Sequence, residues 1–123
     1  TSQSRMENYE PETETKLKLQ QAALEHEKRA FGKSLKILAG CDLAKTVPQL
    51  IPYILELQVR NYMAVMQYKK AEKILNDALK YLPNLRNFLL QRIECLLALN
   101  KINDAKKEIG SLREKVLASK EDT

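Results

Sequence analysis

The side chains that carry most protein chemistry are scarce in this chain of 123 residues. His26 is the only histidine, and the two cysteines, Cys41 and Cys95, stand far apart and form no C-x-x-C pair. Metal sites built from several imidazoles are thereby excluded, and no serine or cysteine is set with a histidine and an acid as nucleophilic catalysis requires. The sequence therefore predicts a protein that is not an enzyme and has no catalytic residue, metal ion or cofactor.

Cysteine usage and apolar patterning together predict the compartment. The two cysteines are expected to be reduced thiols, because no secretory signal accompanies them. No apolar run approaches the length of a membrane span, and the first residues, TSQSRMENYEPETET, are polar. We therefore expect a cytoplasmic protein, with the nucleus as the other possibility, and no membrane partner.

Basic side chains are the remaining groups that could bind a ligand. Lysine and arginine number 21 against 16 acidic residues, a net charge of +5 at pH 7, and both signs are interleaved along the chain. Interleaved charge is typical of solvated helix faces. The alternative is a nucleic-acid surface on which lysines contact phosphates. The lysines concerned are Lys69, Lys70, Lys73, Lys80, Lys101, Lys106 and Lys107.

Composition and periodicity predict an all-α fold. Leucine, lysine, alanine and glutamate are abundant, whereas there are only three glycines and four prolines. These abundant residues lose least on entering a helix. Apolar residues recur at intervals of three and four, and no segment shows the alternation of a strand. A content of 44% apolar residues suffices for one domain with a modest core.

Four segments follow one another along the chain. Residues 1–14 contain four glutamates and almost nothing apolar, which predicts a flexible acidic segment. Residues 15–46 are predicted to form an N-terminal helix, or a degenerate helical hairpin broken at Gly32. Residues 50–85 and 86–119 each predict a pair of helices joined by a short turn.

The last two segments share one pattern. A shift of 34 residues aligns eight pairs of apolar residues without a gap, and it places the turn at Gln67 on the turn at Lys101. Such self-similarity at a fixed period indicates a repeat rather than two unrelated hairpins. The pairs are Leu55 with Leu89, Val59 with Ile93, Tyr62 with Leu96, Tyr68 with Ile102, Ala71 with Ala105, Leu75 with Ile109, Ala78 with Leu112, and Leu82 with Val116.

Small and large residues alternate in the second helix of this unit. Ala71, Leu75, Ala78 and the closing Pro83 give a pattern that resembles the tetratricopeptide repeat, a helix-turn-helix unit of about 34 residues. In the second unit Leu112 replaces the second small residue, which departs from the family pattern. The resemblance implies antiparallel helix-turn-helix repeats, a fragment of an α-solenoid, in which residues 15–46 are at best a degenerate repeat.

The same resemblance implies a binding surface. Stacked units of this family present a concave groove made by their first helices, which holds a peptide or a helix of another protein. The positions expected to face the groove are Tyr53, Glu56, Arg60 and Met63 in one unit, and Asn87, Leu90, Glu94 and Leu97 in the next. The other interpretation is that Tyr53, Leu90 and Leu97 pack inside the chain.

The sequence thus predicts a non-catalytic scaffold that binds another protein within a complex, with an RNA-associated helical-repeat subunit as the alternative. Chaperone-tail binders of the tetratricopeptide family carry a clamp of lysine, asparagine and arginine. Because Glu56 and Glu94 stand at groove positions, we do not expect that role. The RNA-binding pentatricopeptide family is disfavoured by its period of about 35 residues and by the lack of evident base-reading positions.

Overall fold

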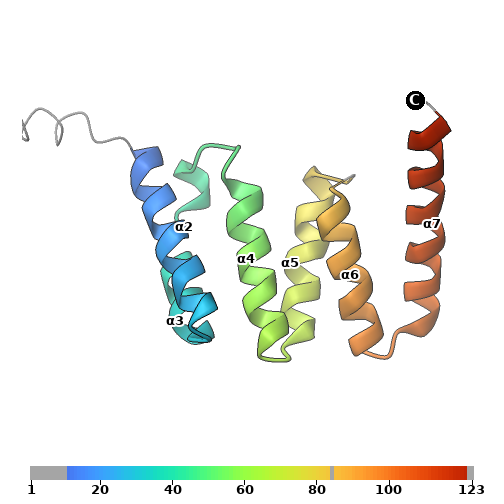
Figure 1. Cartoon of the computed structure of the whole chain (residues 1–123), viewed down its shortest axis with the longest axis horizontal. Coiled ribbons are helices and arrows are strands. Elements are labelled where there is room, and N and C mark those ends of the chain that lie inside the picture. Colours follow the sequence, from blue (N-terminus) through green and yellow to red (C-terminus); the bar gives the residue numbers. More distant parts are fainter. Residues whose placement is uncertain (1–10, 84, 122–123) are drawn as a thin grey trace, which may run out of the picture. The chain divides into compact units, whose positions relative to one another are not determined.

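The computed structural model describes residues 11–83 and 85–121, which form six α-helices and one short 3-10 helix and contain no strand (Figure 1). The predicted all-α fold is confirmed for these residues. They divide into two compact units, the first ending at Val65 and the second beginning at Met66. The first unit holds α2 (Pro11–Glu27), α3 (Phe31–Ala39), η1 (Leu43–Lys45) and α4 (Ile51–Ala64), and the second holds α5 (Tyr68–Tyr81), α6 (Arg86–Ala98) and α7 (Ile102–Glu121).

The start of α2 corrects the predicted flexible segment. Residues 11–14 are helical, while the rest of that segment, residues 1–10, lies outside the described residues. Glu12 and Glu14 stand in the first turn, where carboxylates interact favourably with the helix dipole. Each also pairs with a lysine four residues later. The same glutamates that suggested disorder therefore favour the start of a helix.

Residues 15–46 do not form one continuous helix. The break falls before α3, at Arg29, whose φ of 64° is left-handed. The N–H of Ala30 donates to the carbonyl of Glu25 at 2.8 Å, and the N–H of Arg29 donates to that of His26 at 2.9 Å. This pair of bonds is the Schellman cap that ends a helix. Gly32, the predicted break, lies inside α3.

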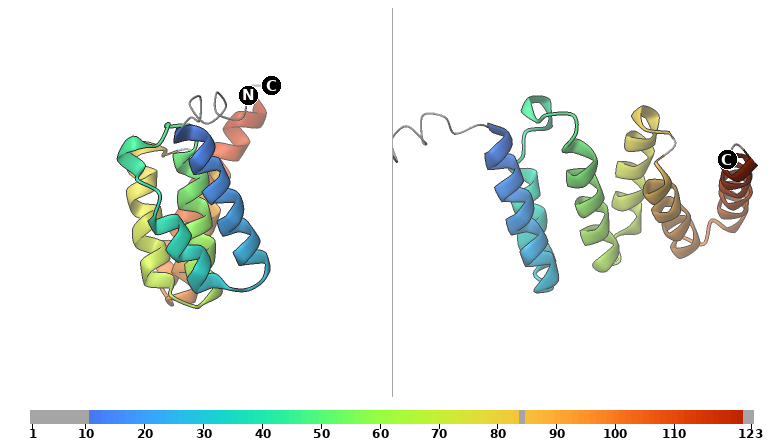
Figure 2. Two further views of the ribbon diagram at one scale, coloured as in Figure 1. Left: turned by 90° about the vertical axis from the view of Figure 1, so that its left-hand side faces the viewer. Right: turned by 45° about the horizontal axis from the view of Figure 1, so that its top comes forward.

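The turn also separates leucines spaced at multiples of seven residues, a spacing that would put them on one face of a single helix. Leu17 and Leu24 on α2 are exposed, whereas Leu38 on α3 is buried. Their spacing of seven indicates a common face only within one helix. Once α2 folds back beside α3 (Figure 2), the two sets of leucines point in different directions.

The turns between α2 and α3, α4 and α5, and α6 and α7 each contain one left-handed residue. Arg29, Met66 and Asn100 are the non-glycine residues with positive φ among those described, and each follows the last turn of a helix. Met66 and Asn100 stand 34 residues apart, the period of the apolar pattern. A left-handed conformation costs an ordinary L-residue roughly 1–2 kcal/mol, whereas asparagine and glycine adopt it readily.

Replacing Met66 by glycine is therefore expected to stabilise the chain by about 0.5–1 kcal/mol, because the left-handed penalty is removed. The Met66 side chain is 77% exposed, so little packing is lost. Urea denaturation of the Met66→Gly variant checks this result. Asn100→Gly is the matched control and should change stability by a few tenths of a kcal/mol at most. An unchanged or lowered stability of Met66→Gly would contradict the left-handed turn.

The core of the first unit lies where α4 packs against both α2 and α3. Its buried residues are Ala22, Leu38, Ile54 and Leu57, with Leu19, Ile37 and Cys41 packed around them. Fully burying an aliphatic side chain contributes about 1.5–3 kcal/mol, so this cluster is the main source of cohesion among the three helices.

A buried polar network joins the same three helices. Ser34 donates to the carbonyl of Ala22 at 2.7 Å, Asn61 donates through Nδ2 to the Ser34 hydroxyl at 2.8 Å, and His26 Nδ1 lies 2.8 Å from Asn61 Oδ1. Because the Ser34 hydroxyl donates its proton to the Ala22 carbonyl, the hydroxyl oxygen of Ser34 accepts the hydrogen bond from Asn61. The amide oxygen of Asn61 then faces His26, which must donate from Nδ1. The network fixes how α4 sits on α2 and α3.

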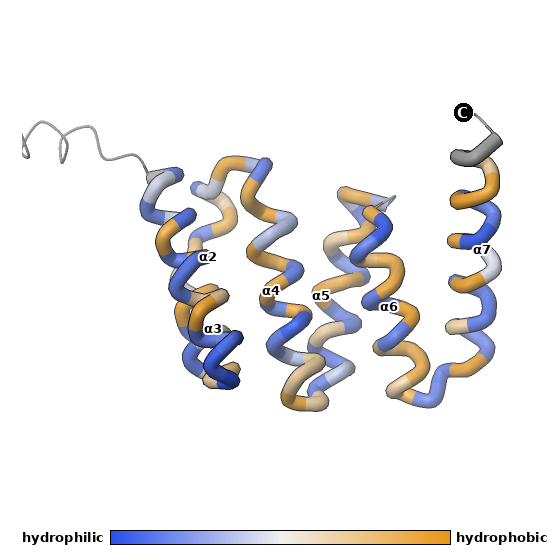
Figure 3. Tube along the Cα trace, in the orientation of Figure 1, coloured by the Kyte–Doolittle hydropathy of each residue, from blue (hydrophilic) through white to orange (hydrophobic). Residues whose placement is uncertain are grey.

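In the second unit α5 and α7 both pack against α6. Figure 3 shows long apolar stretches along α6, and five of its residues are buried, including Phe88 and Cys95. Two ion pairs tie the helices together: Lys101 lies 3.0 Å from Glu72, and Arg92 lies 3.1 Å from Glu108. A helix that is apolar around most of its circumference must be covered on several sides or leave apolar surface exposed.

Candidate partner-binding site

The eight residues predicted to face a partner lie on two helices in different units. Tyr53, Glu56, Arg60 and Met63 are on α4, and Asn87, Leu90, Glu94 and Leu97 are on α6. Spacings of three and four place each set of four on one face of its helix. The structure therefore brings together the members of each set.

All eight side chains reach the surface. Tyr53 is 61% exposed, Leu90 47% and Leu97 48%, so the described residues do not enclose these three. Asn87, Glu94 and Arg60 are exposed, while Glu56 and Met63 are half-buried. The α6 face combines two exposed leucines with two polar side chains.

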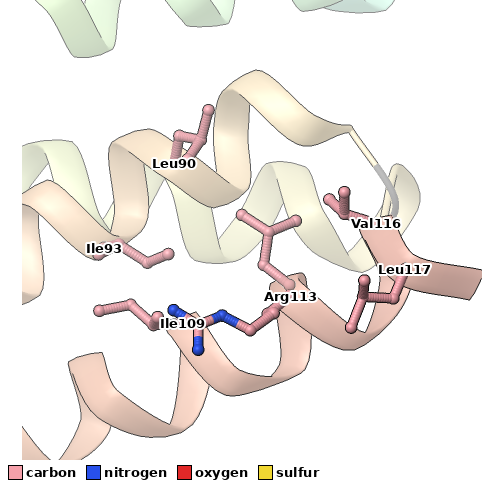
Figure 4. A pocket seen from close by; sticks show the side chains of 7 residues that line it. Leu90, Ile93, Ile109, Arg113, Val116 and Leu117 are labelled. Atoms are coloured by element: carbon pink, nitrogen blue, oxygen red, sulfur yellow. The ribbon is translucent and has the colours of Figure 1, made fainter. Parts of the chain in front are cut away.

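A groove of about 340 Å³ runs between α6 and α7 (Figure 4). Its walls are aliphatic apart from one arginine, and Leu90 is the member of the predicted set that lines it. The lining residues are Leu90, Ile93, Ile109, Leu112, Arg113, Val116 and Leu117. The groove is open to solvent, and its lining is almost entirely apolar.

Side-chain size explains why the groove is open. Near the start of α7, Ala105 is fully buried, because a small residue lets the two helices approach closely. Two turns further along, Leu112 occupies the place that Ala78 holds in α5. The larger leucine keeps the later part of α7 away from α6, and Ile109 and Leu117 remain exposed.

The groove carries a positive charge at its edge. Among the described residues, the Arg113 guanidinium makes no hydrogen bond or ion pair, and Figure 4 shows it beside the Ile109 side chain. Arg92 differs, because its guanidinium is held by Glu108. Residues 66–123 contain twelve basic and eight acidic residues, whereas residues 1–65 contain nine and eight. The net positive charge is thus concentrated in the second unit.

Most of this groove was not predicted from the sequence. The repeat alignment paired Ile109, Leu112 and Val116 with apolar residues of the first unit, and Arg113 was not among the predicted site residues. The groove could have been predicted from Leu112, because a large residue where two helices should approach closely predicts a gap between them.

The lysines of the alternative hypothesis lie on two elements and at the turn before α7. Lys69, Lys73 and Lys80 share one exposed face of α5, because they are separated by four and seven residues. Lys80 lies 3.8 Å from Asp77, and Lys101, in the turn, is bound to Glu72. Lys80 and Lys101 are therefore partly neutralised by neighbouring carboxylates.

The cysteines differ in their surroundings. Both are free thiols, and Cys95 on α6 is fully buried while Cys41 is half-buried. Burial, together with the charges of Glu72 and Glu94, raises the pKa of the Cys95 thiol from 9.0 to about 11. Burial also raises the pKa of Cys41, and the charge of Lys18 partly offsets this rise.

Stability is consequently expected to fall between about pH 9 and pH 11. Below this pH range the Cys95 thiol is protonated in both the folded and the unfolded chain, so it adds no pH dependence to stability. Within the range the thiol ionises only in the unfolded chain, which favours unfolding. Urea denaturation across this range measures the slope. Cys95→Ala should have a shallower slope than the wild type, and equal slopes would contradict the raised pKa.

Neither metal chemistry nor membrane insertion finds support in the part of the chain that the structure describes. No group of three or more histidine, cysteine or acidic side chains there could hold a metal ion. No helix within the described ranges is long and apolar enough to cross a bilayer.

Comparisons of the chain with protein-family models, with curated proteins and with solved structures find no match.

Proposed function

We propose that the protein is a non-catalytic interaction module that binds a helix or peptide of another protein within a multi-protein complex. The observation that supports this most strongly is the open apolar groove between α6 and α7, with Leu90 in its wall. Burying such a surface against a partner is favourable by about 25 cal/mol per Å² of apolar area. The exposed α4 face around Tyr53 and Arg60 is a second proposed contact area.

We also propose that α4 to α7 are helix-turn-helix repeats similar to the tetratricopeptide type. Two pairs of residues 34 positions apart support this interpretation. Ala71 and Ala105 are both fully buried, and Met66 and Asn100 both adopt the left-handed conformation. We expect the cytosol or the nucleus as the compartment, because both cysteines are free thiols.

The proposal is tested by comparing what the intact chain and two variants retain from an extract of its own cells. Leu90→Asp places a charge in the groove, whereas Leu24→Asp places the same charge at an exposed leucine of α2. We expect the wild-type chain to retain a protein partner, and ribonuclease treatment should not release it. Leu24→Asp should retain the same partner, whereas Leu90→Asp should lose it although the helical content of the variant is unchanged. Equal retention by both variants would contradict the proposal.

An RNA-associated subunit remains the second candidate because Lys69, Lys73 and Lys80 share an exposed face of α5. Phosphate contacts release counterions, so binding by these lysines would weaken steeply with added salt, whereas an apolar groove would respond little. Loss of the retained material on ribonuclease treatment would favour this second candidate.

A further inference from the structure

The shape of the groove indicates what could fill it. In the first unit α4 packs against two neighbouring helices and buries Ile54 and Leu57 between them. In the second unit α5 packs against α6, but the groove that α6 forms with α7 stays open. Two helices with an apolar groove between them accept a third helix through its apolar face, as helix-in-groove interfaces do.

The charge at the edge indicates which helix fits. Arg113 lines the groove and makes no ion pair within the described part of the chain. Lys106 precedes it by seven residues and is exposed, so the two cations stand on the same side of α7, about two turns apart. A partner helix lying along α7 would meet both positive charges beside its apolar face.

We propose that the groove binds an amphipathic helix of another protein whose apolar stripe is flanked by acidic residues. The apolar stripe packs on Leu90 and Val116, and a partner carboxylate pairs with Arg113. A second carboxylate, about two turns away on the partner, reaches Lys106. This inference rests on the proposed function and adds the chemistry of the partner. Apolar burial supplies the affinity, and the charges select the partner and its orientation.

The test uses two synthetic peptides of about 18 residues, each with leucines at helical spacing. One peptide carries glutamates beside the leucine stripe, and the other carries lysines at the same positions. Each is labelled with a fluorophore, and its binding to the whole chain is measured by fluorescence anisotropy at physiological salt. The variants are Arg113→Glu and, as the control, Lys115→Glu, which makes the same charge change on the opposite side of α7.

We expect the acidic peptide to bind the wild type at least tenfold more tightly than the basic one. Arg113→Glu should abolish or reverse this preference, and Lys115→Glu should leave it unchanged. Equal binding of both peptides, no binding of the acidic peptide, or a preference that Arg113→Glu does not alter would each overturn the proposal. The retention experiment with Leu90→Asp tests the proposed function separately. If that variant loses the cellular partner, the proposed function stands even when the peptide experiment fails.

Discussion

Replacing Asn61 by leucine is expected to lower the free energy of unfolding by about 2–4 kcal/mol. The Asn61 side chain is fully buried, and its amide bonds both Ser34 and His26. Leucine has a similar volume but no polar atom, so the donor of His26 loses its acceptor inside the first unit. Urea denaturation followed by circular dichroism measures the loss.

The matched control is Asn76→Leu, the same substitution at an exposed position of α5, which should change stability by less than about 0.5 kcal/mol. A double-mutant cycle with Ser34→Ala separates the network from general packing. If Asn61 and Ser34 act through their hydrogen bond, the two losses should not add. Additive losses, or an Asn61→Leu variant as stable as the wild type, would contradict the network.

Replacing Ala105 by leucine is expected to cost about 1–3 kcal/mol, because the larger side chain overpacks a fully buried site. Ala105 lies near the start of α7, which packs against α6. Leucine would force the two helices apart, and the groove further along α7 would change shape with them. Thermal denaturation and peptide binding measured on the same variant report the two effects.

Ala98→Leu serves as the comparison, since Ala98 is an exposed alanine at the end of α6. It should leave stability within about 0.5 kcal/mol of the wild type. If Ala105→Leu were equally neutral, the close approach of α6 and α7 at this alanine would be wrong, and the explanation of the groove by side-chain size would fail with it.

The sequence was sufficient for the helices within residues 50–119 and for the turns at Gln67 and Lys101, because apolar spacing and turn positions are local properties. For residues 15–46 the sequence left one helix and a helical hairpin open, and it did not place the break between α2 and α3 at Arg29. The left-handed turn at Arg29 could not be anticipated, since arginine has no particular preference for that conformation. A glycine at Gly32 was the more obvious breaker, yet it lies inside a helix.

Periodicity in the sequence could predict exposed helix faces but not the groove. The spacing of Leu90 and Leu97 placed both on an exposed face, as periodicity within one helix allows. The groove beside Leu90 depends instead on the separation of α6 from α7. We attribute that separation to the sizes of Ala105 and Leu112, which both lie on α7. Such distances between helices are a tertiary property, and a single sequence does not contain them explicitly.

The most direct test of the central claim is amide hydrogen exchange of the chain alone and with the partner protein that it retains. Binding in the groove predicts slower exchange around Leu90 on α6 and from Ile109 to Leu117 on α7, with α2 and α5 unchanged. Protection confined to the lysine face of α5, or no protection along α7, would contradict the account and place the partner elsewhere.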